Sequence, residues 1–331
     1  MKGHRRMKHA TKQFGLLLLG IIALHATAEY GERDEVQAFI GELAANDAFD
    51  PVELKRVFEG AVYKQSIIDA ISRPAERVLN WASYQDIFLT ETRVRQGIAF
   101  EQKHRATFDA VEAKWGVDRW IILAILGVET SYGRNKGRFR VIDALSTLAF
   151  DYPPRAKFFR QELRQLFLLA REQKRPVASF VGSYAGAMGF GQFIPSSYRH
   201  YAVDFNSDTF IDIWDEPADA IASVANYLAV HKWQSGGPVL SAVPKLKAAP
   251  EDVFNQGLKP TVTLQSLMDH GVSMAGVAAT AQVLPLKYEG KRGNEYWLGF
   301  QNFYVITRYN RSRLYAMAVF QLSQQLREGS A

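Results

Sequence analysis

The sequence has no cysteine among its 331 residues. Without a thiol, the chain forms no disulfide, builds no zinc–thiolate site and offers no cysteine nucleophile. It also lacks the cysteine that a bacterial lipoprotein needs for acylation. Function classes that depend on a thiol are therefore excluded.

Long apolar runs are also scarce. The apolar runs at residues 14–24 and 120–128 are both shorter than the roughly 20 residues that span a bilayer. Residues 1–28 combine a basic start, the first of these runs and the small-residue ending Ala-Thr-Ala, which predicts a signal peptide cleaved after Ala28. The alternative is an uncleaved anchor or a buried first helix. We expect an exported, soluble periplasmic protein.

A strong excess of one charge is absent once the leader is set aside. The net charge is +6, but residues 1–28 hold five of the 40 Lys and Arg residues and no acid. The remainder carries 35 basic and 34 acidic side chains. A phosphate backbone is bound by a concentrated basic face. The balanced chain therefore argues against a nucleic-acid partner.

The spacing of apolar residues divides the chain. From residue 34 to 228 they recur at intervals of three and four, the pattern of helices with one buried face. Between residues 233 and 302, proline and glycine separate short apolar runs, with a turn-like segment at 289–294. Helical spacing returns at residues 309–326. The sequence predicts a mainly α (α+β) fold with a small β-rich insert.

One carboxylate has an unusual position. Residues 120–128 are apolar on nearly all sides, as in a helix within a core, and Glu129 follows directly. Gly133 can end this helix, which places the carboxyl at the edge of the core. Such surroundings raise the pKa of a carboxyl, as a general acid near neutral pH requires. The alternative is a solvated glutamate paired with Arg134 or Arg138.

Four segments, one of them containing this glutamate, resemble the membrane-bound lytic transglycosylase B family. They are residues 127–133, which read Gly-Val-Glu-Thr-Ser-Tyr-Gly, and residues 144–153, 182–198 and 306–310. The similarity runs in order from about residue 73 to 319. It implies a lysozyme-like helical core and an enzyme that cleaves peptidoglycan glycan strands.

The resemblance also implies roles for single residues. Glu129 matches the family's one catalytic acid/base. Nine others match positions that line the substrate cleft: Tyr84, Arg155, Ser183, Gln192, Phe193, Tyr227, Tyr309, Asn310 and Tyr315. Pro154 replaces the first of two arginines that usually follow Tyr-Pro. Judged without the family, the glutamine, the phenylalanine and the last two tyrosines could be structural or core residues. No histidine shows ligand spacing, and none is assigned a role.

A single acid suits a lytic reaction. Ordinary glycosidases place two carboxylates across the scissile bond. In the lytic route, Glu129 protonates the β-1,4 oxygen between N-acetylmuramic acid and N-acetylglucosamine, and the muramic C6 hydroxyl then attacks C1 to give a 1,6-anhydro end. Ser183 is the candidate to hold the N-acetyl carbonyl, and tyrosines offer stacking faces. The alternatives are a lysozyme-type hydrolase and a non-catalytic peptidoglycan-binding protein.

An EF-hand-like loop follows. Residues 204–215 place oxygen ligands at positions 1, 3, 5, 9 and 12, although Thr209 stands where glycine is usual. By the family's pattern an acid just beyond them also belongs to the candidate ligands of a structural Ca²⁺. The full set is Asp204, Asn206, Asp208, the Phe210 carbonyl, Asp212, Asp215 and Asp219. The alternative is a solvated acidic turn with Asp219 capping the next helix. No organic cofactor is expected.

These inferences predict a division of the chain and a set of partners. We expect peptidoglycan strands as the substrate, no transmembrane span after leader removal, a monomer, and cell-wall synthesis or remodelling proteins as further candidate partners. The predicted parts are a signal peptide (1–28), an N-terminal helical region (29–115), a lysozyme-like catalytic core (116–232) with the EF-hand-like loop (204–219), a small β-rich domain (233–303) and a C-terminal helix packed on the core (304–331).

Overall fold

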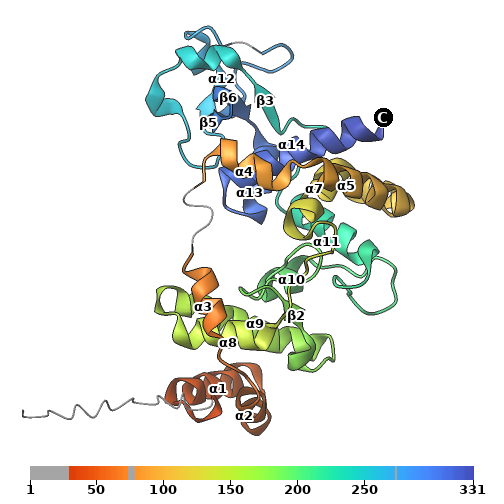
Figure 1. Ribbon diagram of the computed structural model, residues 1–331, viewed down its shortest axis with the longest axis vertical. Coiled ribbons are helices and arrows are strands. Elements are labelled where there is room, and N and C mark those ends of the chain that lie inside the picture. The colour runs from red at the N-terminus through yellow and green to blue at the C-terminus, as the bar shows by residue number, and fades with distance from the viewer. Residues whose placement is uncertain (1–29, 74–78, 273) are drawn as a thin grey trace, which may run out of the picture.

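The computed structural model describes residues 30–73, 79–272 and 274–331. Helices dominate this part of the chain, and one small sheet lies at the end of the molecule opposite the first helices (Figure 1). The mainly helical fold class with a small β-rich insert is confirmed. No helix of the described residues is long and apolar enough to cross a membrane. The predicted signal peptide lies outside the described residues.

The first helices pack on a pair from the middle of the chain. Helix α3 contacts α8, which pairs with α9, while α1 and α2 pack together below them in Figure 1. Helix α2 begins where Asp50 accepts a 2.8 Å bond from the Val52 amide, with Pro51 in the first turn. The bounds are α1 (Asp34–Asp47), α2 (Pro51–Glu59), α3 (Gln65–Ile71), α8 (Val141–Asp151) and α9 (Ala156–Glu172).

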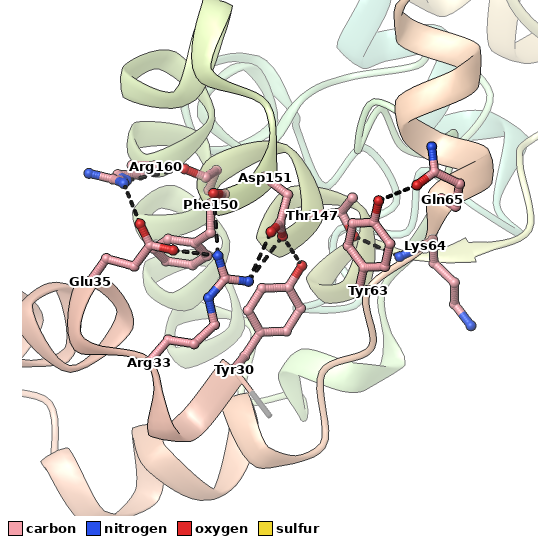
Figure 2. A network of polar contacts seen from close by, with 11 residues as sticks. Tyr30, Arg33, Glu35, Tyr63, Lys64, Gln65, Thr147, Phe150, Asp151 and Arg160 are labelled. Atoms are coloured by element: carbon pink, nitrogen blue, oxygen red, sulfur yellow. Dashed lines mark hydrogen bonds and ion pairs between the residues drawn. The ribbon is translucent and has the colours of Figure 1, made fainter. Parts of the chain in front are cut away.

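A polar network fixes the start of the described chain to the end of α8 (Figure 2). The hydroxyl of Tyr30, which is buried, donates a 2.5 Å bond to Asp151. The guanidinium of Arg33 donates to both oxygens of the same carboxylate, at 3.0 and 3.2 Å, and also pairs with Glu35. One carboxylate thus holds two side chains that precede α1.

Helix α7 lies at the centre of a second group of helices. Every residue from Ile121 to Val128 is buried, because α5, α6, α11 and α14 all pack against this helix. This surrounding explains why its sequence is apolar on nearly all sides. The bounds are α4 (Trp81–Phe88), α5 (Glu91–Lys103), α6 (Arg105–Trp115), α7 (Arg119–Thr130), α10 (Pro195–Tyr201), α11 (Pro217–Val230), α13 (Gln301–Tyr309) and α14 (Arg313–Ser330).

The larger sheet is antiparallel, with the strand order β3-β6-β5-β4. Strands β5 and β6 form a hairpin closed between Gly290 and Gly293, whose φ of 109° suits glycine. A separate apolar cluster lies under this sheet, and β5 also contacts α4. The sheet therefore lies beside α4, which carries the predicted site residue Tyr84.

The remaining elements are short. Strands β1 and β2 form a two-stranded pair, and α12 follows β4. The strands are β1 (Phe139–Arg140), β2 (Val181–Gly182), β3 (Leu240–Ala242), β4 (Val262–Thr263), β5 (Gln282–Gly290) and β6 (Gly293–Gly299), and α12 is Leu264–Met268. Short 3₁₀-helices cover Tyr30–Glu32, Pro153–Arg155, Val177–Ser179, Pro244–Ala248 and Glu251–Val253.

Candidate active site

Glu129 lies in the last turn of α7 and is half-buried. The hydroxyl of Tyr315 donates a 2.8 Å hydrogen bond to Oε1 of Glu129. Tyr315 lies in the first turn of α14, where its own amide donates to the side chain of Ser312 at 3.2 Å. Packing of α14 on α7 therefore brings the carboxyl and its donor together.

The electrostatics of this pair keep the tyrosine neutral. Burial first, and then the charge of Glu129, raise the pKa of Tyr315 well above its usual value of 10. Burial and the same charge raise the pKa of Tyr309 in the same way. Tyr84, on α4, contributes to the same rise in the pKa of Tyr315. Glu129, Tyr84, Tyr309 and Tyr315 thus form one cluster from four helices.

Two of the predicted tyrosines bind main-chain carbonyls. Tyr309 donates a 2.6 Å bond to the Gly191 carbonyl, and Tyr227 donates a 2.5 Å bond to the Arg308 carbonyl. The ring of Phe193 lies 5.7 Å from the Tyr309 ring and 5.9 Å from the Tyr227 ring, centroid to centroid. These contacts fasten the segment before α10 to α11 and α13.

Ser183 lies in a tight turn of that segment. Its Oγ accepts hydrogen bonds from the amides of Ala185 and Ala187, at 3.3 and 3.1 Å. Because both bonds use the oxygen as acceptor, the hydroxyl proton can be donated to a further acceptor. The turn thus presents an oriented donor on a half-buried side chain.

Gln192 has a left-handed backbone, with φ of 52°. Its Nε2 donates to the carbonyls of Gly189 and Lys136, at 3.0 and 3.3 Å. These two bonds hold the side chain against the loop that follows α7. The side-chain nitrogen of Gln192 therefore stabilises the loop.

Two further predicted site residues lie next to helix ends. Arg155 is exposed just before α9, and its guanidinium lies over the rings of Phe158 and Phe159, at 4.5 and 5.0 Å. Asn310 follows α13 directly, is half-buried, and its carbonyl accepts a 2.7 Å bond from the Ser312 amide.

The acidic loop before α11 is organised by its own carboxylates. Asp219 is fully buried in the first turn of α11, and its two oxygens accept 2.8 Å bonds from the amides of Phe205 and Asp212. Asp204 accepts three further loop amides, the shortest at 2.6 Å. Asp219 therefore clamps both ends of the loop to the helix.

The loop has oxygen donors suited to a hard cation, but its described side chains do not converge on one point. No group of three or more His, Asp or Glu side chains within the described ranges is close enough to hold a metal ion. Asp215 instead pairs with Lys136 at 3.0 Å and is 82% exposed. The predicted ligands thus lie in one loop without forming a cage.

The sequence reasoning missed one acid of this loop. Glu216 accepts a 2.6 Å bond from the Asn206 amide group. Burial, followed by the charges of Asp219, Asp208 and Asp212, raises the pKa of Glu216. Its position between Asp215 and the proline that starts α11 could have indicated that Glu216 belongs to the acidic loop.

The chain is similar to known proteins over most of its length. Residues 31–324 match the model of the family described as the Transglycosylase SLT domain. Membrane-bound lytic murein transglycosylase B of Escherichia coli (strain K12) is 37% identical over 306 residues, which cover 89% of this chain and 83% of that protein.

Solved structures agree with this assignment. Soluble lytic transglycosylase SltB1 of Pseudomonas aeruginosa is 48% identical, with a TM-score of 0.85 over 90% of this chain and 100% of that one. Lytic transglycosylase Slt35 of Escherichia coli, solved in complex with calcium, is 36% identical, with a TM-score of 0.82 over 90% and 94%. The fold is that of peptidoglycan-cleaving lytic transglycosylases. The chain belongs to the Transglycosylase SLT domain family, and the resemblance read from its motifs is confirmed.

Proposed function

We propose that Glu129 is the single acid/base of a lytic murein transglycosylase, which cuts the β-1,4 bond between N-acetylmuramic acid and N-acetylglucosamine. The observation that carries this proposal is the 2.8 Å bond from Tyr315 to Glu129 at the end of a buried helix. The neutral Tyr315 hydroxyl orients this half-buried carboxyl, and a positioned carboxyl is what general acid–base catalysis requires.

The proposed reaction uses the carboxyl twice. Glu129 first gives its proton to the glycosidic oxygen, and the bond from that oxygen to C1 of the muramic sugar breaks. The ionised Glu129 then takes the proton of the muramic C6 hydroxyl while O6 bonds to C1. The carboxyl is regenerated and a 1,6-anhydro end forms without consuming water.

The surrounding residues supply binding. Ser183 presents an oriented hydroxyl that can donate to the N-acetyl carbonyl. We assign substrate contacts also to Tyr84, Gln192, Phe193, Tyr227, Tyr309, Asn310 and Tyr315, several of which share the Glu129 cluster. Arg155 also belongs to the proposed set, and its described contacts are with the rings of Phe158 and Phe159 in α9.

The substitution Glu129→Gln tests the acid/base assignment. It keeps the shape of the side chain and removes the titrating group, so strand cleavage should be lost while folding and glycan binding survive. The matched control is Glu53→Gln, at an exposed position of α2. Mass spectrometry of digested sacculi should detect anhydro products. Products heavier by one water would favour hydrolysis, and full turnover by Glu129→Gln would exclude the assignment.

We also infer a structural Ca²⁺ and an exported location. The Escherichia coli Slt35 structure contains calcium, and the loop at 204–219 offers the oxygen donors that Ca²⁺ prefers. The proposed ligands are Asp204, Asn206, Asp208, the Phe210 carbonyl and Asp212. Because Lys136 pairs with Asp215, Asp219 is the favoured closing carboxylate. The basic and apolar leader supports export to the periplasm.

A further inference from the structure

The chain directly after Glu129 adopts an unusual conformation. Ser131, Tyr132 and Gly133 all have left-handed backbones, with φ of 51°, 60° and 84°. Only the glycine takes this conformation without strain. Two strained residues in succession persist only where the surrounding structure fixes them, and such strain concentrates at functional sites.

Hydrogen bonds hold this turn from inside. The Thr130 hydroxyl donates to the Phe190 carbonyl and accepts from the Gly133 amide, both at 2.9 Å. The Ser131 and Tyr132 amides donate back to α7 at 3.0 and 3.1 Å. The turn is thus a continuation of the helix that carries Glu129.

The Tyr132 side chain occupies a slot that two glycines create. A Cβ at Gly97 would lie 2.4 Å from the Tyr132 hydroxyl oxygen, and one at Gly127 would lie 2.7 Å from it. Phe100 stacks on the ring, with centroids 5.9 Å apart and planes at 28°. Helices α5 and α7 therefore pack tightly against the Tyr132 side chain.

Arg93 of α5 reaches the same turn. Its NH2 group donates a 3.3 Å bond to the Ser131 hydroxyl, and its guanidinium lies 5.1 Å from the centre of the Phe88 ring. Its NH1 atom and the Tyr132 hydroxyl are buried without a hydrogen-bond partner in the described part of the chain. Arg93 is half-buried, and leaving one of its guanidinium nitrogens buried without a partner is costly, so packing alone would favour an apolar side chain at this position.

We propose that Arg93 is a positioning residue for Glu129: it holds Ser131 and Tyr132 in the left-handed turn and so orients the carboxyl. The inference rests on the proposed role of Glu129. Helix α5 packs on both α7 and α14, which carries Tyr315. Arg93 therefore acts from the helix that supports both members of the Tyr315–Glu129 pair.

The test compares substitutions at Arg93 with one at a neighbouring arginine. Arg93→Met keeps an unbranched side chain and removes the guanidinium. We expect kcat on isolated glycan strands to fall by about 10- to 100-fold with KM nearly unchanged, since a small misplacement of a reacting group has this effect. Arg93→Lys should recover part of kcat, because an ammonium can still donate to Ser131. The control Arg95→Met alters an exposed arginine of the same helix and should leave kcat unchanged.

Ser131→Ala provides an independent arm. If Arg93 acts through the Ser131 hydroxyl, combining Ser131→Ala with Arg93→Met should lower kcat no further than the larger single effect. If Arg93→Met does not fold, Arg93→Lys and Ser131→Ala carry the comparison. Wild-type kcat in Arg93→Met below its melting temperature, or a change in KM alone, would overturn the proposal. Loss of activity in Glu129→Gln together with full activity in Arg93→Met would reject only the role of Arg93.

Discussion

Tyr315 and Glu129 are separated by 186 positions in the sequence, yet the tyrosine hydroxyl lies 2.8 Å from the carboxylate. Glu129 lies in the last turn of α7, and Tyr315 lies in the first turn of α14. The site is therefore complete only when the last helix packs on the centre of the fold. Under the proposed role of Glu129, this bond makes the C-terminal helix part of the catalytic apparatus.

The substitution Tyr315→Phe should test this relationship. It removes the donor to Glu129 while the ring still fills its buried position. A hydrogen bond to a charged group contributes about 1.5 to 3 kcal/mol, so kcat should fall by about 10- to 100-fold. Steady-state kinetics on isolated glycan strands measures the effect.

A second buried tyrosine supplies the control. Tyr198 donates a 2.6 Å bond to the Ile211 carbonyl and has no contact with Glu129 among those the structure describes. Tyr198→Phe should lower the melting temperature but leave kcat unchanged. Equal kcat in wild type and Tyr315→Phe would mean that the hydroxyl does not assist the carboxyl.

The buried helix could be predicted from the sequence because it leaves a strong local signal. A helix that is apolar on all sides must be covered by other helices on all sides. Helix α7 is covered in this way. Periodicity indicates which face of a helix is buried but not which partner covers it. The packing of α3 on α8 and the hydrogen bond from Tyr315 to Glu129 are long-range contacts, and periodicity does not predict them.

Other features leave almost no signal. Arg93 lies on an amphipathic helix, where an arginine is usually a solvated residue, and its contact with Ser131 arises only in the folded chain. In the acidic loop the spacing located the carboxylates, but not that Asp219 would bond to backbone amides at both ends. A pattern of residue types does not specify which of several acceptors a donor selects.

Calcium should stabilise the protein through the acidic loop. A ligand that binds only the folded state at 100 times its Kd adds about 2.7 kcal/mol to the free energy of unfolding. The melting temperature of a metal-free preparation should therefore rise when Ca²⁺ is added, and rise less with Mg²⁺, which demands a more rigid geometry.

Charge-neutral variants can locate this effect. Asp204→Asn and Asp208→Asn should each reduce the shift caused by Ca²⁺, while Asp252→Asn, at an exposed position outside the loop, should not. An identical melting temperature with and without Ca²⁺ would argue that the carboxylates only organise the loop backbone.

The network at Asp151 should contribute to stability (Figure 2). Asp151→Asn removes the charge that pairs with Arg33 while an oxygen acceptor for Tyr30 remains. We expect a loss of about 1.5 to 3 kcal/mol in the free energy of unfolding, the range for hydrogen bonds to charged groups. Urea denaturation would measure it. Asp69→Asn, which alters an exposed acid on α3, serves as the control, and equal midpoints for the two variants would contradict the expectation.

His231 should make the stability depend on pH. Its ring stacks on Tyr227 with centroids 4.2 Å apart, and Nδ1 lies 2.8 Å from the Tyr227 carbonyl. Burial is the main cause that lowers the pKa of His231 in the folded protein. In the window between that lowered pKa and the unfolded value of about 6.5, the unfolded chain binds more protons, so stability rises with pH and is lost as the pH falls.

The substitution His231→Gln should therefore flatten the pH dependence of the unfolding free energy below about pH 6.5. Burial also lowers the pKa of His104, at the junction of α5 and α6. His104→Gln should remove a separate part of the slope. The double variant should then lose both parts, because the contributions of independent sites add. Denaturant titrations between about pH 5 and 8 measure the slopes, and a slope in His231→Gln as steep as that of wild type would show that His231 protonates freely in the folded protein.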